Sequence, residues 1–194
     1  FRYADANDLD SVKAQADDTT CAVMLELIQG EGGVLPLDKD FIQALAAWCQ
    51  ENDYLLLVDE VQTGIGRTGS LFCFQQYDIQ PDAVTFAKGI AGGLPMAGVM
   101  CSEKCRNVLG PGTHATTFGG NPIAAAGANV VLDELDDAML AEVNQKGEYL
   151  KSAIAAFDSP YVDTVRGMGL MIGIVLKEGV DRSALVKALY DHNL

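Results

Sequence analysis

The 194-residue sequence predicts an α/β layer structure, in which helices cover both faces of a sheet. Two observations support this prediction. The apolar runs over residues 21–28, 54–58 and 82–87 are nearly continuous and do not alternate with polar residues, as expected for strands buried on both faces. Segments with helical periodicity separate these runs, and that order of elements is typical of α/β proteins.

The N-terminal part is predicted to contain two helices and one strand. Asp8 can cap a short first helix. The apolar strand over residues 21–28 is interrupted by Glu26 and followed by a glycine-containing loop over residues 29–33. Asp38 then opens a longer helix. The apolar residues of this helix recur at helical spacing: Phe41, Leu45, Trp48 and Cys49.

The middle of the chain is predicted to contain two more buried strands, each followed by a glycine-rich loop. The first strand, over residues 54–58, delivers two carboxylates, of which Asp59 is the first. A short helical piece over residues 74–77 leads to the second strand, over residues 82–87, which ends at Lys88. An acid and a lysine are therefore expected at the carboxyl ends of two strands.

The C-terminal half is predicted to begin with a strand over residues 97–101, a helix over residues 102–109 and a turn-rich loop. Pro122 starts an alanine-rich helix, and a long amphipathic helix covers residues 138–157. The character of the sequence changes after this helix, where an apolar segment over residues 162–175 precedes a last helix. We expect a domain boundary within the long amphipathic helix.

Charge and composition exclude several classes of function. The net charge of −14 argues against a nucleic acid or an acidic membrane as partner. No apolar run approaches the ~20 residues of a membrane helix and no signal peptide is visible, so we expect a cytoplasmic protein. The five cysteines are odd in number and indicate reduced thiols. The two histidines, His114 and His192, lie far apart, and we expect no metal site.

The residues most suited to catalysis lie at the ends of the two central strands. A carboxylate such as Asp59 is costly to bury unless a cation pairs with it. A lysine such as Lys88 becomes nucleophilic in an apolar pocket beside another cation. An acid that keeps a pyridine nitrogen protonated and a lysine that forms a Schiff base are what a pyridoxal-phosphate enzyme requires.

Other roles for these residues stay open at this point. Asp59 can simply cap the following loop, and Lys88 can extend its stem along apolar surface with its amine in water. Four apolar residues followed by Asp-Glu also match a Walker-B strand, but the phosphate loop G-x-x-x-x-G-K-[ST] occurs nowhere in the sequence. The loop with Thr116 and Thr117 precedes a helix, where hydroxyl and N–H groups form either a phosphate site or a helix cap.

In combination these motifs resemble the class III pyridoxal-phosphate aminotransferases. The resemblance rests on residues 59–69, the Lys-Gly pair at Lys88 and residues 117–122, with further matches over residues 26–33 and 165–170. It covers essentially the whole chain. It implies the large domain of a fold type I pyridoxal-phosphate transferase, with a mixed, mostly parallel sheet and helices on both faces. Part of a small α+β C-terminal domain would follow.

The resemblance also implies domain limits and site residues. Residues 1–137 would belong to the large cofactor-binding domain, and residues 138–194 would form the connecting helix and part of the small domain. Asp59 would pair with the pyridine nitrogen of pyridoxal 5'-phosphate, and Lys88 would form the Schiff base and shuttle the proton. Thr117 would bind the cofactor phosphate across the interface of a homodimer.

Five further positions follow from the same resemblance. Val61 would pack against the cofactor ring, and Gln62 would hydrogen-bond its hydroxyl oxygen. On the substrate side, Glu31 matches an acid that pairs with a carboxylate-binding arginine in relatives acting on ω-amines, and Glu26 would support the floor of the site. Leu27 stands where the family usually has proline, and we expect only a local backbone effect.

The implied reaction moves the terminal amino group of N-acetylornithine to 2-oxoglutarate, a step of arginine biosynthesis. Within the family, ornithine, succinylornithine or 4-aminobutyrate is the alternative amino donor. Arg67 and Arg166 match family positions, but neither matches the arginine that binds the α-carboxylate. An N-terminal phosphate-binding loop is also missing, so we expect this chain alone to be inactive. A truncated, non-catalytic product that aggregates through an exposed dimer surface is a third possibility.

Overall fold

The computed structural model describes all 194 residues and has a four-stranded sheet at its centre, in the order β1-β4-β5-β6. The strands are β1 (Ala22–Leu25), β4 (Leu55–Asp59), β5 (Ala83–Phe86) and β6 (Gly98–Cys101). β4 pairs in parallel with both β1 and β5, whereas β6 is antiparallel to β5. The predicted mixed, mostly parallel sheet is therefore confirmed.

The chain contains five α-helices, some beside this sheet and others beyond it. They are α1 (Leu9–Gln15), α2 (Lys39–Glu51), α3 (Pro122–Glu134), α4 (Asp137–Ala156) and α5 (Arg182–Asp191). The predicted caps Asp8 and Asp181 are confirmed, because each carboxylate accepts a hydrogen bond from an N–H of the first turn. α2 follows Asp38 as predicted, although this side chain makes no capping bond.

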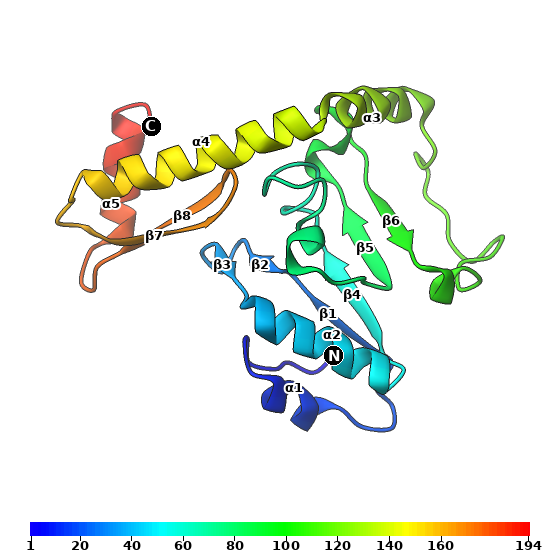
Figure 1. Cartoon of the computed structure of the whole chain (residues 1–194). Helices are drawn as coiled ribbons and strands as arrows, with labels where there is room; N and C mark the ends of the chain where they lie inside the picture. Colours follow the sequence, from blue (N-terminus) through cyan, green and yellow to red (C-terminus); the bar gives the residue numbers. More distant parts are fainter.

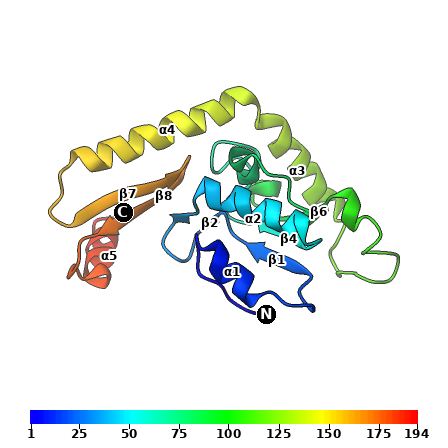
Figure 2. The ribbon, with the colours of Figure 1, turned by 60° about the horizontal axis from the view of Figure 1, so that its bottom comes forward.

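The main core lies between α2 and one face of the sheet. Leu45 and Cys49 of α2 pack in one buried cluster with Leu56 and Val58 of β4. Figures 1 and 2 show α1 and α2 on this side of strands β1 and β4. Since side chains alternate along a strand, Asp59, which follows Val58, lies on the opposite face.

The face that carries Asp59 is more open. The registers of β1, β4, β5 and β6 place Met24 and Val99 on the same face as Asp59, and both apolar side chains are more than half exposed. A second, smaller core lies beyond the ends of the strands, where Ala128 of α3 packs on Ile90. The carboxyl ends of β4 and β5 are therefore close to both a core and an open surface.

Two sequence predictions about elements are wrong. The apolar run over residues 21–28 is not one strand, because the chain leaves the sheet after β1 and forms β2 (Ile28–Gln29), which pairs with β3 (Leu35–Pro36). At the break, the buried Leu27 carbonyl accepts hydrogen bonds from Leu37 N–H (2.9 Å) and Tyr77 Oη (3.2 Å). These partners lie far along the chain, so no local pattern reveals them.

The predicted helix over residues 102–109 is reduced to the 3₁₀ turn η3 (Glu103–Cys105). Within this segment only Cys105 is buried. A short helix is marginal without an apolar face to pack, and here nothing offsets the cost of its nucleation. The short helical piece before β5 is confirmed as a 3₁₀ helix, η1 (Cys73–Tyr77).

The C-terminal part is a long helix and a β-hairpin. Figure 1 shows α4 running from the region of the sheet to the hairpin of β7 (Val162–Met168) and β8 (Met171–Leu176). α4 approaches the turn of this hairpin closely at Gly147, next to the backbone of Gly169. The predicted division of the chain at residue 138 stays a prediction.

No helix is both long enough and apolar enough to span a membrane. All five cysteines are free thiols, of which Cys21 and Cys101 are exposed.

Candidate active site

Asp59 is oriented by two hydrogen bonds at the carboxyl end of β4. Its Oδ1 accepts from the N–H of Val61 (2.9 Å) and from Oγ1 of Thr85 (3.0 Å) on the neighbouring strand. Both bonds go to the same oxygen, so Oδ2 is available for a further donor. The side chain is half-buried and not fully buried, because it faces the open side of the sheet. The carboxylate is thus held in place with one oxygen free.

Lys88 lies two residues past the end of β5, at the start of the 3₁₀ turn η2 (Lys88–Ala91). Its φ of +48° is left-handed, which costs a non-glycine residue about 1–2 kcal/mol. Backbone strain of this kind gathers at functional sites. The residue is exposed, and its amine makes no hydrogen bond or ion pair. Lysine chemistry at this position is therefore not blocked by an internal partner.

Parallel pairing brings the two predicted catalytic residues to one edge of the sheet. Asp59 ends β4 and Lys88 follows β5, its parallel neighbour. The two side chains do not form an ion pair within 4.0 Å. The carboxylate and the amine are therefore not engaged with each other.

A cavity of about 290 Å³ lies at Lys88. Its polar lining consists of Lys88, Gln62 and Arg67, with no carboxylate. The Arg67 guanidinium makes no hydrogen bond or ion pair, and sequence reasoning assigned it no role. The cavity therefore carries two free cations in a chain of net charge −14, which favours an anionic ligand. Its apolar lining comes from distant segments: Val34, Leu170, Met171 and Ile172.

Glu60 is the fully buried carboxylate of this region, and sequence reasoning did not single it out. Its oxygens accept hydrogen bonds from Thr63 Oγ1 (2.7 Å), Cys73 N–H (2.9 Å) and Phe74 N–H (2.7 Å). Burial raises the pKa of Glu60, and the three donors offset this rise only in part. These bonds tie the end of β4 to η1 and so brace the loop between them. The threonine three residues later was the only local signal.

Of the two residues predicted on the substrate side of the site, Glu31 lies on the turn between β2 and β3, and Glu26 lies between β1 and β2. Glu31 is exposed at the tip of this turn. Glu26 accepts a hydrogen bond from Gly30 N–H at 3.1 Å, which agrees with a supporting role. Gln62 packs against Gly30 so closely that a Cβ there would lie 2.6 Å from its Oε1. The structure therefore brings the Glu31 turn and the Gln62 loop into contact.

Thr117 is not near this group. It lies in the exposed loop between η3 and α3, which Figure 1 shows at the far side of the sheet from the hairpin. It does not line the Lys88 cavity. Within one chain it has no contact with the other predicted residues, and a role in this site requires a second subunit. Val61, by contrast, directly follows the Asp59–Glu60 pair and is half-buried.

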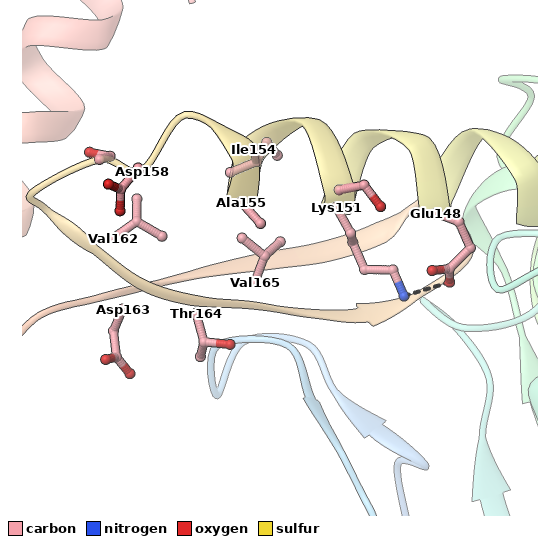
Figure 3. Close-up of a pocket in the computed structure, with 11 residues that line it drawn as sticks. Glu148, Lys151, Ile154, Ala155, Asp158, Val162, Asp163, Thr164 and Val165 are labelled. Carbon is pink, nitrogen blue, oxygen red and sulfur yellow. Dashed lines mark ion pairs between the residues drawn. The ribbon is translucent and has the colours of Figure 1, made fainter.

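A larger cavity, of about 470 Å³, lies between α4 and β7 (Figure 3). Figure 3 shows Lys151 pointing from α4 toward the strand, where its Nζ pairs with Glu148 at 2.7 Å and donates to the Gly167 carbonyl at 3.2 Å. None of the predicted site residues lines this cavity. Its lysine is occupied by internal partners, so we do not assign it as the active site.

Comparison with known proteins identifies the family of this chain. The family model "Aminotransferase class-III" matches residues 3–194. Acetylornithine aminotransferase of Streptococcus mutans is 48% identical over 199 residues, covering 100% of this chain and 52% of the relative. The corresponding protein of Haemophilus ducreyi is 45% identical over 187 residues, covering 96% of this chain and 47% of the relative. The chain thus spans about half the length of the curated relatives that it matches.

Solved structures give the same result. N-acetylornithine aminotransferase from Stenotrophomonas maltophilia superimposes with a TM-score of 0.85 at 39% identity, covering 99% of this chain and 50% of that one. Ornithine delta-aminotransferase of Plasmodium falciparum has a TM-score of 0.87 at 31% identity, with 96% and 50% covered.

Proposed function

This chain belongs to the class III aminotransferases, and from that premise we propose that Asp59 and Lys88 form the centre of a pyridoxal-phosphate site. One observation carries the proposal. A lysine amine without an internal partner lines a cavity at the sheet edge where an oriented carboxylate keeps one oxygen free. An amine and an acid at adjacent strand ends are the groups that this cofactor needs.

Asp59 holds a proton at the pyridine nitrogen in this proposal. Val61 N–H and Thr85 Oγ1 fix Oδ1, which leaves Oδ2 as the oxygen that would accept from the ring N–H. The bound cofactor supplies an electron sink for the substrate carbon that loses its proton. Val61 would pack beside the ring, and the Gln62 amide N–H would donate to the ring hydroxyl oxygen.

Lys88 would hold the cofactor through Nζ and would be the base that moves a proton during the reaction. Arg67 lines the same cavity as Lys88 and adds a second cation to it. The two cations also attract the carboxylates of amino acid and 2-oxo acid substrates. The wall that includes Leu170 and Ile172 offers an apolar surface to the bound groups.

For the whole protein we propose transfer of the terminal amino group of N-acetylornithine to 2-oxoglutarate, a step of arginine biosynthesis. The names of the most similar curated relatives support this donor. Ornithine is the second candidate, since solved ornithine aminotransferases have the same fold at about 31% identity. Glu31 is the residue of this chain that we assign to the substrate side of the site.

We also propose a homodimer, in which Thr117 completes the phosphate site of the partner subunit. Ile123 and Val130 lie seven residues apart on one face of α3, and both are exposed, as is Phe118 beside the helix. An apolar helix face of this kind is typical of a subunit interface. Free thiols at all five cysteines agree with a cytoplasmic location.

Borohydride trapping tests the proposed site directly. The chain is mixed with pyridoxal phosphate, the imine is reduced and the labelled lysine is mapped by peptide mass. We expect Lys88 to carry most of the label, and Asp59→Asn to raise the cofactor concentration for half-labelling about tenfold. Labels spread over Lys13, Lys104 and Lys151 would overturn the proposed site. Protection of Lys88 by N-acetylornithine, compared with ornithine and 4-aminobutyrate, ranks the amino donors.

A further inference from the structure

The hairpin at the C-terminal end is attached to the Glu31 turn by one arginine. Arg166 of β7 donates from Nε (3.2 Å) and from Nη2 (2.8 Å) to the carbonyl oxygen of Gly33. No other hydrogen bond or ion pair of this guanidinium is present. The two residues are separated by 133 positions in the chain. A two-pronged contact of a rigid guanidinium fixes the position of its acceptor more narrowly than a single bond.

The turn that Arg166 contacts is strained. Gly33 and Val34 are consecutive residues with positive φ, at +108° and +55°. Glycine adopts such angles freely, but a β-branched residue at positive φ is a genuine outlier. The N–H groups of both residues donate to the Gly30 carbonyl, at 3.1 Å and 3.2 Å. Strain at one residue persists only where the surrounding contacts hold it.

The same hairpin leaves room for the strained side chain. A Cβ at Gly173 of β8 would lie 2.9 Å from Cβ of Val34 and 3.1 Å from the Gly33 oxygen. The Val34 side chain therefore packs onto a glycine and reaches the Lys88 cavity, which it lines. On its other side the turn rests against Gln62 at Gly30. Arg166 and Gln62 thus enclose the turn between them.

We propose that Arg166 is a positioning residue for the substrate. It holds the 30–34 turn in its strained form, so that Val34 stays in the cavity wall and Glu31 stays on the substrate side. The proposal deepens the proposed function and rests on it for the role of Glu31. Because Arg166 contacts the turn and does not itself line the Lys88 cavity, we expect its loss to weaken substrate binding more than cofactor attachment.

Hydrogen exchange of the chain tests the attachment without any activity. Arg166→Met keeps the apolar stem and removes the donors. We expect the amides of Gly33 and Val34 to exchange about tenfold faster, as two lost hydrogen bonds imply. Arg182→Met is the matched control, because that exposed arginine of α5 makes no side-chain contact to a polar group. Unchanged exchange in Arg166→Met would overturn the proposal, whatever the cofactor does.

A substitution of Val34 tests the backbone strain at this residue separately. Asparagine adopts left-handed angles more readily than valine. In a Val34→Asn background the effect of Arg166→Met on exchange should therefore shrink to about twofold. Equal effects in both backgrounds would show that Arg166 does not hold Val34 in its strained form.

The substrate effect is measured at Lys88. In Arg166→Met we expect the N-acetylornithine concentration that half-protects Lys88 from labelling to rise about tenfold, while the pyridoxal-phosphate concentration for half-labelling changes less than twofold. Arg166→Lys, with one donor group, should recover part of this loss. Equal weakening for cofactor and substrate would overturn the positioning role. Absence of Lys88 labelling in the unmodified chain would instead overturn the proposed function, and the exchange result would still stand.

Discussion

Replacing Gly147 by alanine sets helix propensity against tertiary packing. Gly147 is the buried residue of the 20-residue helix α4. In an isolated helix this change stabilises by about 1 kcal/mol, because glycine loses more backbone entropy than alanine. Here the new Cβ would lie 2.7 Å from the carbonyl carbon of Gly169 and still closer to its oxygen. These are backbone atoms of the hairpin turn, which cannot rotate away.

The distance by which the Gly169 carbonyl must move sets the size of the stability loss. Moving the Gly169 carbonyl carbon from 2.7 Å to an ordinary contact of 3.4 Å requires a shift of about 0.7 Å, and the oxygen must move further. Gly169 itself lies against the backbone of Thr68, and Leu170 N–H donates to the Arg67 carbonyl at 3.0 Å. Overpacking of this kind costs about 1–3 kcal/mol or more. With one hydrogen bond weakened as well, we expect a net loss of about 2 kcal/mol despite the gain in propensity.

Thermal and urea unfolding measure this loss. For a chain of this size, 2 kcal/mol lowers Tm by about 4–8 °C. Ser152→Ala, at an exposed position of the same helix, is the control and should raise stability by a few tenths of a kcal/mol. Because Leu170 lines the Lys88 cavity, Gly147→Ala should also reduce labelling of Lys88. A Gly147→Ala chain that is more stable than the parent would refute the close packing of α4 on the hairpin.

Three further predictions concern buried polar groups. Tyr77→Phe removes the hydroxyl that donates to the Leu27 and Leu37 carbonyls, although Leu27 keeps the Leu37 N–H, and should cost about 1–2 kcal/mol in urea unfolding, whereas Tyr54→Phe should cost much less. Glu60→Ala leaves three buried donors without an acceptor and should cost about 3 kcal/mol or more in unfolding free energy. Burial raises the pKa of Glu60 in the folded state, so the folded chain binds a proton more readily than the unfolded chain does. The unfolding free energy of the parent, relative to Glu60→Gln, should therefore increase as pH falls from the raised pKa toward 4.5. Burial also raises the pKa of Cys73 to about 12, so a thiol reagent at pH 8 should modify Cys101 quickly and Cys73 only after unfolding.

Most elements of the fold follow from local patterns. The caps Asp8 and Asp181 were sufficient to predict α1 and α5, and the apolar spacing was sufficient to predict α2. Both kinds of signal depend only on residues within a few positions of each other. The apolar pattern failed where a tertiary contact decides the end of a strand. It did not reveal the break at Leu27, whose carbonyl partners are Leu37 and Tyr77.

For the site, the sequence by itself determined the chemistry available at the two strand ends: an acid at Asp59 and an amine at Lys88. Only the tertiary structure decided that Glu60 is the buried carboxylate and Asp59 the half-open one, since the covering of each sheet face depends on distant segments. It also decided that Arg166 reaches Gly33. Contacts between residues more than a hundred positions apart leave no periodicity in the sequence, because each depends on how separately formed elements pack.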